Sequence, residues 1–445
     1  MESLHVHICM RSVIVLSALC INLYTSAAMA EDPYQGAWSR QLGTTSDDIS
    51  RSVTVDGAGN IFISGRTKGS LSGTNAGGYD AFLAKYDPAG TLLWTKQLGT
   101  NLSDQSWSVA VDGVGNAFIS GFTKGTLSGT NAGDWDAFLT KYDPAGNLLW
   151  TEQLGTSNEE LSRSVAVDTS GNAFISGRTK GSLSGTNAGG YDAYLSKYDT
   201  NGNLLWTEQL GTSHSDNSSS VAVDGAGNIF ISGSTEGNLG GINAGHDDAF
   251  LSKYDTNGNL LWTEQLGTSG YDHSNSVVVD GSGNVFISGG TSGHLGGTGE
   301  GSTDAYLAKY DSTGNLLWTE QIGTSHSDYS SSVAVDGAGN IFISGTTYGN
   351  LGGVNSGGYD AFLCKYGPAG NLLWTEQLGT SGYDHSYSIV VDGTGNAFIS
   401  GSTYGSLGGI NAGERDAFLV KYAVPEPATL SLLALGGLTM RRRKS

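Results

Sequence analysis

One spacing constrains this chain more than any other feature of its sequence: a tryptophan recurs every 56 residues. The seven copies are Trp38, Trp94, Trp150, Trp206, Trp262, Trp318 and Trp374. Between successive copies the same motifs return in the same order, as variants of SVAVDG, FISG, a Gly-rich segment, DAFL and KYD. A fixed period of this length indicates a repeat architecture. One such unit buries too little apolar surface to fold alone, so the units must pack on one another.

Each unit contains four runs that predict short β-strands. In the first copy these are Ser52–Asp56, Ile61–Arg66, Asp80–Tyr86 and Leu92–Leu98, which are rich in β-branched or aromatic residues with apolar alternation. Tight turns containing Gly, or Pro and Gly, join the first run to the second and the third to the fourth. Longer segments join the second run to the third and the fourth run to the next unit. We therefore expect four antiparallel strands in each unit.

The two ends of the repeat region decide how the units assemble. The region begins with a strand of the fourth type, Ala37–Leu42, and ends with a strand of the third type, Asp416–Tyr422, which has no fourth strand after it. If the first strand completes the last unit, the ring closes and no unit lacks a strand. This predicts an all-β fold, a single seven-bladed β-propeller with four strands per blade. An open solenoid is the alternative, but it would leave both ends unpaired and would call for atypical capping repeats.

The run SVAVDGxGNxFISGxTxGxLxGxNAGGYDAFLxKYDxxGNLLWTEQLG resembles the SBBP family of bacterial β-propeller repeats. The resemblance covers residues 37 to 422. It implies a propeller that is exported to the bacterial surface. It implies no reaction, because the family has no shared catalytic residues to carry over.

The first 30 residues are expected to be a secretory signal. Arg11 supplies a positive start, Ser12–Tyr24 is apolar, and Ala28-Met29-Ala30 fits a small-residue cleavage pattern before Glu31. Met10 is an alternative start. The expected domains are a signal peptide over 1–30, a propeller over 31–423 and a sorting segment over 424–445.

The last segment combines three features in a fixed order. Pro425, Glu426 and Pro427 precede a short apolar run over 428–440, and a basic cluster of Arg441, Arg442 and Arg443 follows. The apolar run is short for a full membrane span, which needs about 20 residues. The order resembles the PEP-CTERM sorting signal, which implies an exosortase-type processing enzyme as a partner and transient membrane contact through the tail. A simple C-terminal anchor is the alternative. The predicted location is the cell surface or the extracellular space.

Charge and cysteine content limit the classes of partner. The formal net charge is −20, from 22 basic and 42 acidic residues, which argues against a nucleic-acid surface because that needs a basic footprint. Cys9 and Cys20 lie in the predicted signal, so the exported chain keeps only Cys364 and has no disulfide framework. We interpret Cys364 as a packed core thiol.

Repeated polar residues are weighed as metal or catalytic groups. One acid recurs in the segment between units: Asp48, Asp104, Glu160, Asp216, Asp272, Asp328 and Asp384. These acids either form a cation-collecting ring or hold loop amides, and recurrence in every unit favours the second. The Asp-Gly-Ala-Gly-Asn segments favour hairpin turns over calcium loops. Four histidines, in four different units, are too dispersed for a zinc site: His214, His273, His326 and His385. No metal, cofactor or catalytic set is therefore predicted.

Two positions vary between otherwise uniform units. The residue before the first strand is Arg51, Trp107, Arg163, Ser219, Asn275, Ser331 or Tyr387, and the residue before the third strand is Tyr79, Trp135, Tyr191, Asp247, Thr303, Tyr359 or Arg415. Either these positions drifted because they are exposed, or they build one asymmetric site. Both belong to the side of a propeller that carries the longer loops. Aromatic and arginine side chains dominate many binding sites, so the predicted ligand-binding residues are Arg51, Trp107, Arg163, Tyr387, Tyr79, Trp135, Tyr191 and Tyr359.

The functional expectation is a non-enzymatic binding or scaffold module of the cell surface or extracellular matrix. Its expected partner is an exopolysaccharide or another surface protein, because aromatic faces near hydroxyl and amide groups suit sugar rings. The alternative is a secreted lyase or glycosidase that acts on extracellular polysaccharide. A glycosidase needs two carboxylates placed across a bond, and no pair of acids is singled out by the sequence.

Overall fold

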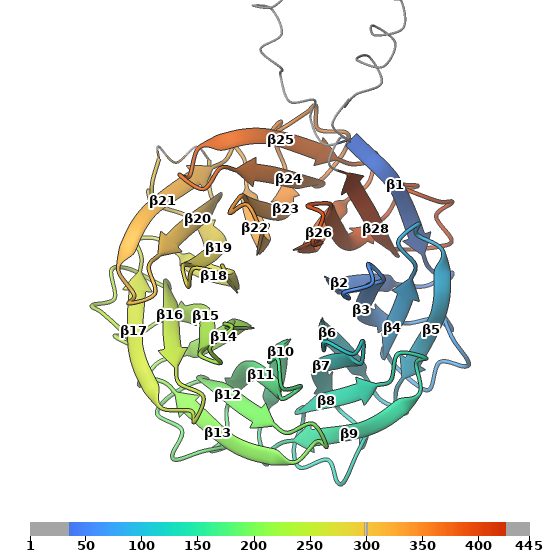
Figure 1. Cartoon of the computed structure of the whole chain (residues 1–445), viewed down its shortest axis with the longest axis horizontal. Coiled ribbons are helices and arrows are strands. Elements are labelled where there is room, and N and C mark those ends of the chain that lie inside the picture. Colours follow the sequence, from blue (N-terminus) through green and yellow to red (C-terminus); the bar gives the residue numbers. More distant parts are fainter. Residues whose placement is uncertain (1–34, 298, 300, 424–445) are drawn as a thin grey trace, which may run out of the picture. The chain divides into compact units, whose positions relative to one another are not determined.

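The computed structural model describes residues 35–297, 299 and 301–423, and its propeller unit spans Gly36–Tyr422. The predicted secretory signal and the sorting tail, with Pro425, Glu426, Pro427 and the three terminal arginines, lie outside the described residues. The described strands form seven four-stranded antiparallel sheets arranged as the blades of a ring (Figure 1). No helix among the described residues is long and apolar enough to cross a membrane.

Each blade runs from an innermost strand at the ring axis outward. The innermost strands are β2 (Asp48–Val55), β6 (Asp104–Val111), β10 (Glu160–Val167), β14 (Asp216–Val223), β18 (Asp272–Val279), β22 (Asp328–Val335) and β26 (Asp384–Val391). The second strands are β3 (Ile61–Thr67), β7 (Ala117–Thr123), β11 (Ala173–Thr179), β15 (Ile229–Thr235), β19 (Val285–Thr291), β23 (Ile341–Thr347) and β27 (Ala397–Thr403).

The outer half of each blade repeats with the same regularity. The third strands are β4 (Asp80–Tyr86), β8 (Asp136–Tyr142), β12 (Asp192–Tyr198), β16 (Asp248–Tyr254), β20 (Asp304–Tyr310), β24 (Asp360–Tyr366) and β28 (Asp416–Ala423). The outermost strands are β5 (Leu92–Leu98), β9 (Leu148–Leu154), β13 (Leu204–Leu210), β17 (Leu260–Leu266), β21 (Leu316–Ile322), β25 (Leu372–Leu378) and β1 (Gln35–Leu42). We number the blades from one (β2–β5) to seven (β26, β27, β28 and β1).

The ring closes as the sequence predicts. The strand order of blade seven is β26-β27-β28-β1, so the first strand of the chain completes the last blade. A serine in every innermost strand accepts a hydrogen bond from a backbone N–H of the next blade. This series returns to its start, because Val53 of blade one donates to Ser388 Oγ of blade seven at 3.1 Å. The Asp48 N–H also donates to the carbonyl of Arg415 across the same junction, at 2.7 Å.

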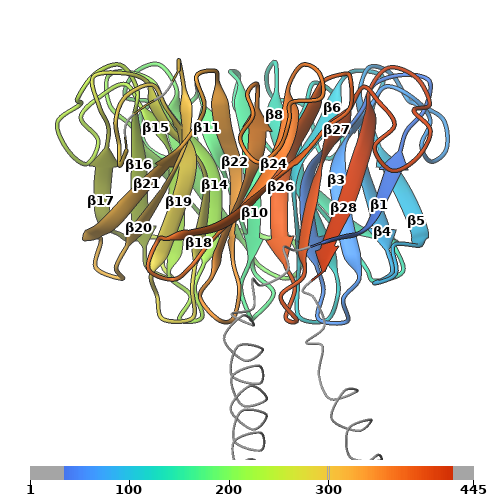
Figure 2. The same cartoon turned by 90° about the horizontal axis from the view of Figure 1, so that it is seen from above.

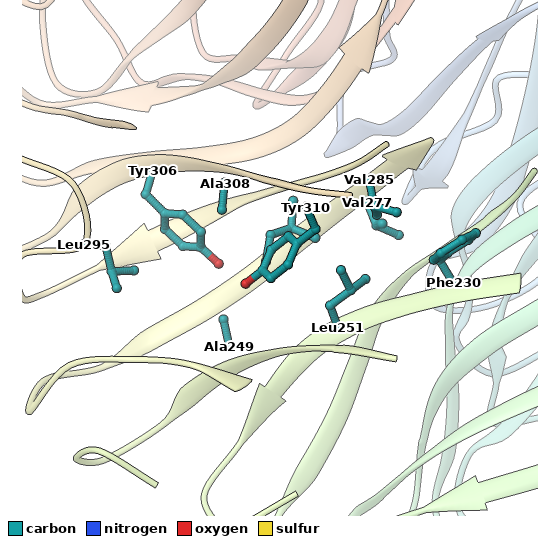
Figure 3. Packing of buried hydrophobic residues seen from close by; sticks show 10 residues of the cluster. Phe230, Ala249, Leu251, Val277, Val285, Leu295, Tyr306, Ala308 and Tyr310 are labelled. Carbon is teal, nitrogen blue, oxygen red and sulfur yellow. The ribbon is translucent and has the colours of Figure 1, made fainter. Parts of the chain in front are cut away.

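The hydrophobic core lies between adjacent blades. Figure 3 shows one such cluster, in which Phe230 and Leu251 of blade four pack with Val277, Val285 and Tyr310 of blade five. All of these side chains are buried. Because the apolar face of each sheet is covered only by its neighbour, the closed ring leaves no blade with an uncovered face.

The innermost strands are longer than expected. The sequence pattern placed the start of the first one at Ser52, whereas β2 begins at Asp48 and continues through a β-bulge at position 51. The bulge breaks the alternation of apolar and polar residues, and this hid the first half of the strand. Gly65 on β3 makes the bulge possible, since a Cβ there would lie 1.8 Å from the Ile49 carbonyl oxygen. A glycine occupies the equivalent place in every blade.

Antiparallel pairing sends the two kinds of connection to opposite ends of the ring. The tight turns, 56–60 and 87–91 in blade one, lie at one end. The longer segments, 68–79 and 99–103 in blade one, lie at the other end with their equivalents (Figure 2). We call the second end the long-loop face.

Candidate functional site

The seven variable residues of the innermost strands converge on the ring axis. Each is the bulged residue of its strand, and all seven line one cavity of about 290 Å³. The serines that follow six of them, all except Trp107, complete the lining: Arg51, Ser52, Trp107, Arg163, Ser164, Ser219, Ser220, Asn275, Ser276, Ser331, Ser332, Tyr387 and Ser388. The sequence pattern placed these residues just before the strands and left open whether they are exposed or build one site. They lie instead within the strands and are half-buried. The bulge explains the difference, because it leaves the extra residue unpaired and re-aims its side chain.

On one side of this cavity, four side chains form a continuous stack. The Arg51 guanidinium lies 4.5 Å from the Trp107 ring centroid and 4.3 Å from that of Tyr387. The Arg163 guanidinium lies 4.8 Å from the same Trp107 ring. Trp107 therefore contacts two cations, a geometry that stabilises guanidinium groups. The aromatic surfaces expected to face a sugar ring are occupied by arginine.

Three of the four predicted residues before the third strands hold cations in the same way. Arg178 lies 4.1 Å and Lys180 4.6 Å from the Tyr191 ring centroid, and Lys124 lies 4.8 Å from that of Trp135. Tyr79 repeats this arrangement with Arg66 and Lys68: the arginine lies 4.6 Å and the lysine 5.4 Å from its ring centroid. The long-loop face of blades one to three thus gathers basic side chains within a chain of net charge −20.

The fourth of these residues, Tyr359, belongs to an aromatic cluster of blades six and seven. Its ring centroid lies 5.1 Å from that of Tyr348, 6.1 Å from Tyr383 and 5.5 Å from His385. Tyr404 extends the cluster at 6.1 Å from Tyr383. Unlike the half-buried residues that line the cavity at the ring axis, Tyr348, Tyr383 and Tyr404 keep 46%, 48% and 47% of their surface exposed.

Sequence reasoning missed these three exposed tyrosines. Comparison of the copies contains the signal, because Tyr383 stands where other blades have Asp, Ser, Glu or Tyr. Tyr348 and Tyr404 stand where others have Lys, Glu or Ser. We therefore add both positions to the variable set of the long-loop face.

The carboxylates that recur between units, from Asp48 to Asp384, stabilise loops by accepting hydrogen bonds. Asp48 Oδ2 accepts hydrogen bonds from the Thr44 N–H at 2.6 Å and from the Thr44 hydroxyl at 2.8 Å. Burial raises the pKa of Asp48, and the hydrogen bonds from Thr67 and Thr44 oppose that rise. These acids begin the innermost strands and are buried, whereas the sequence pattern placed them in the loops between units. Their hydrogen bonds match the structural interpretation and not that of a cation-collecting ring.

The hairpin acids act in the same manner. Asp56 Oδ1 accepts the N–H groups of Ala58 and Asn60, and Asn60 Nδ2 donates to Asp56 Oδ2 at 2.8 Å. Gly59 has a φ of 81°, which explains why glycine stands at this point of the turn. Among the described residues, no three His, Cys, Asp or Glu side chains gather as a metal site requires.

The histidines and the cysteine have separate environments. His385 is enclosed by the aromatic cluster, and burial together with the nearby Arg415 and Arg51 lowers its pKa to about 4. His273 is also desolvated, and its pKa is lowered. Cys364 is fully buried in the core between blades five and six, where burial raises the thiol pKa to about 12.

The repeat region matches the model of a known protein family. The beta-propeller repeat model SBBP matches seven segments of the chain, one in each 56-residue unit: 37–71, 93–127, 149–183, 205–240, 261–296, 317–352 and 373–408. This chain belongs to the SBBP family. The PEP-CTERM protein-sorting motif matches residues 423–444, which indicates export and sorting to the cell surface.

Two curated proteins are similar to this SBBP chain. Regulatory protein FlaEY of Caulobacter vibrioides is 29% identical over 233 residues, which are 46% of this chain and 24% of that protein. An uncharacterized WD repeat-containing protein of Acanthamoeba polyphaga mimivirus is 23% identical over 496 aligned residues, 82% of this chain and 36% of that protein. The SBBP chain thus spans about a quarter and about a third of the length of these relatives.

Solved structures resemble this SBBP propeller only distantly. BamB from Moraxella catarrhalis is 12% identical with a TM-score of 0.44, covering 88% of this chain and all of that one. A protein of unknown function from Bacteroides caccae is 12% identical with a TM-score of 0.40, covering 68% of this chain and 92% of that one. Likeness at this level does not bear on what the SBBP chain binds.

Proposed function

We propose that this protein is a non-enzymatic binding module of the bacterial cell surface or extracellular matrix, and that its long-loop face binds an extracellular glycan. One observation carries the proposal. Most of the aromatic and basic side chains that differ between the seven blades gather at one end of the ring and around its axis, whereas the tight turns at the other end differ mainly in small residues. A uniform scaffold with one differentiated face suits the recognition of a ligand that has no seven-fold symmetry.

The exposed tyrosines of blades six and seven support a glycan as the ligand. Tyr348, Tyr383 and Tyr404 present half-exposed phenol rings at the long-loop face. A shallow depression beside them is lined by Ser302, Ser325, Ser327, His326, Tyr348 and Tyr359, together with Gly301. Aromatic rings beside hydroxyl groups suit sugars, whose rings offer apolar CH faces edged by hydroxyls.

Three features support binding without catalysis. The buried acids that begin the innermost strands accept hydrogen bonds from loop groups, as Asp48 does from Thr44. The acids that begin the third strands act alike, since Asp80 Oδ2 accepts the N–H of Ala76 and a hydrogen bond from Gln97 Nε2. The hairpin acids brace their own turns.

The test is retention on immobilised bacterial polysaccharides, with release of reducing ends scored in the same samples. The variant combines Tyr383→Ser with Tyr404→Ser, because serine already stands at these positions in other blades. We expect the parent to be retained without cleavage. The double variant should bind at least about tenfold more weakly than the parent. A loss of that size is ordinary for aromatic anchors.

The matched control is Val114→Ala on the opposite end of the ring. Val114 is exposed in a tight turn, and alanine occupies its place in three other blades. If the double variant is retained as well as the parent, the exposed tyrosines of blades six and seven are not part of the binding site. Release of reducing ends would replace the binding proposal with the lyase or glycosidase alternative.

A further inference from the structure

The cavity at the ring axis, which we call the channel, differs in chemistry from the aromatic cluster of blades six and seven, which we call the tyrosine cluster. Its seven bulged residues divide it into two unlike walls. Blades seven, one, two and three contribute Tyr387, Arg51, Trp107 and Arg163, whereas blades four to six contribute Ser219, Asn275 and Ser331. One wall is therefore cationic and the other offers only hydroxyl and amide groups.

The two arginines of the cationic wall lack ionic partners within the protein. Among the described residues, no carboxylate lies within ion-pair distance of Arg51 or Arg163. Two neighbouring arginines do have such partners: Arg415 pairs with Asp47 at 2.7 Å and Arg178 with Glu159 at 3.6 Å. The fold thus gives Arg415 and Arg178 a carboxylate partner and leaves the two arginines at the axis, like Arg66, without one in the described part of the chain.

Burial makes this arrangement costly unless an anion relieves it. Desolvation is the main cause that lowers the pKa of Arg51 to about 10, and the same holds for Arg163. Both side chains still carry their charge at neutral pH. Like charges that lie close together, largely shielded from water and without a counter-charge, destabilise a fold. The stack on Trp107 and Tyr387 offsets part of this cost and fixes the direction of the guanidinium edges.

Hydrogen-bond donors at the axis are unused. Arg51 Nε and Trp107 Nε1 are buried, and neither has a hydrogen-bond acceptor among the described protein groups. Each cavity serine that follows a bulged residue accepts a backbone N–H from the next blade, as Ser52 does from Val109, which leaves its own O–H able to donate. Guanidinium groups with free edges bind carboxylate or phosphate by paired hydrogen bonds.

We propose that the channel is a binding site for a small hydroxylated oxyanion, such as a sugar acid or a sugar phosphate, with its anionic group between Arg51 and Arg163 and its hydroxyls toward Ser219, Asn275 and Ser331. The volume of about 290 Å³ is near the lower limit of small-molecule pockets, about 300 Å³. It suits one sugar unit and not a folded peptide. The site is separate from the tyrosine cluster and does not rest on the glycan proposal.

This site can be tested by isothermal titration calorimetry. The protein is purified from cells that express the full chain. The probes are glucuronate, glucose 6-phosphate, glucose and inorganic phosphate. We expect at least one of the two charged sugars to bind and to raise the melting temperature, while glucose binds at least tenfold more weakly. Tighter binding of glucuronate assigns a carboxylate ligand, and tighter binding of glucose 6-phosphate assigns a phosphate ligand.

The variant is Arg51→Ser combined with Arg163→Ser, because blades four and six already carry serine at this position. It should lose binding at least tenfold without a fall in the melting temperature of the free protein. The matched control is Arg40→Gln with Lys96→Gln, which removes two charges from the outermost strands β1 and β5, where the other five blades carry glutamate. It should change binding less than about twofold. Absence of binding by any charged sugar, equal binding of glucose, or binding unchanged in the arginine variant overturns the proposal.

Discussion

At the scale of residues, the bulge glycine determines where the variable side chains point. Gly65 faces the Ile49 carbonyl so closely that no Cβ fits between the two strands. The bulge that this contact allows places Arg51 at the axis, and the same bulge with a glycine at the equivalent place recurs in each blade. A residue without a side chain thereby positions the residues that carry the chemistry.

Replacement of this glycine should destabilise the propeller strongly. In Gly65→Ala the new Cβ would lie 1.8 Å from the Ile49 oxygen and would have to displace backbone. Overpacking of this kind costs about 3 kcal/mol or more at the severe end, which is measurable as a lower midpoint of urea unfolding. Gly57→Ala is the control, because a Cβ there meets no described atom within 4 Å. Equal midpoints for the two variants would show that the bulge is not held by this contact.

At the scale of elements, the strand β1 determines whether the ring is closed. Trp38 packs against Phe398 of blade seven, with ring centroids 6.1 Å apart. Gln41 Nε2 donates to Asp416 Oδ2 at 2.8 Å, and Gln41 Oε1 accepts the Leu407 N–H at 3.1 Å. These contacts repeat those of the outermost strands elsewhere, but no hairpin connects β1 to β28. Strand pairing and these side-chain contacts hold the junction without a covalent hairpin.

Deletion of residues 31–43 should therefore open the ring. Removal of β1 exposes the edge of β28, and an exposed strand edge promotes aggregation. We expect a lower melting temperature and aggregation by light scattering. A deletion variant that melts like the parent would mean that the ring is not closed by this strand.

A milder pair of variants isolates the effect of chain connectivity. Trp38→Ala with Gln41→Ala weakens β1, and Trp206→Ala with Gln209→Ala makes the same change in β13, which a hairpin joins to β12. The first pair should aggregate sooner than the second. Equal behaviour would argue that the junction has no special weakness.

Most of the elements could be predicted because the period exposes them seven times. The four strands per unit, the two kinds of connection and the closing strand all follow from aligned copies, and the structure has them. The first half of the innermost strand could not be predicted, because the bulge at Arg51 interrupts the alternation on which strand prediction relies. The variable positions were visible as differences between copies. The sequence did not show that these side chains point into the channel, because their direction depends on the bulge geometry and on the close approach at Gly65.

At the scale of the whole molecule, charge is distributed unevenly. The chain has a net charge of −20, yet the long-loop face of its first three blades gathers arginines and lysines that stack on Tyr79, Trp107, Trp135 and Tyr191. The tyrosine cluster lies on blades six and seven. An acidic body with one basic sector favours an anionic partner that approaches from that end.

The matched sorting motif and the proposed surface role together predict where the full chain is found. On intact producing cells, the parent should be accessible to a membrane-impermeant label or to external protease. Replacement of Pro425, Glu426 and Pro427 by alanine should leave the protein in the inner-membrane fraction, because the motif that matches over 423–444 no longer directs sorting. Surface labelling of the parent, with at least a severalfold loss in the alanine variant, is the result that the account predicts. Equal labelling of parent and variant, or a parent that is never labelled on intact cells, would contradict it.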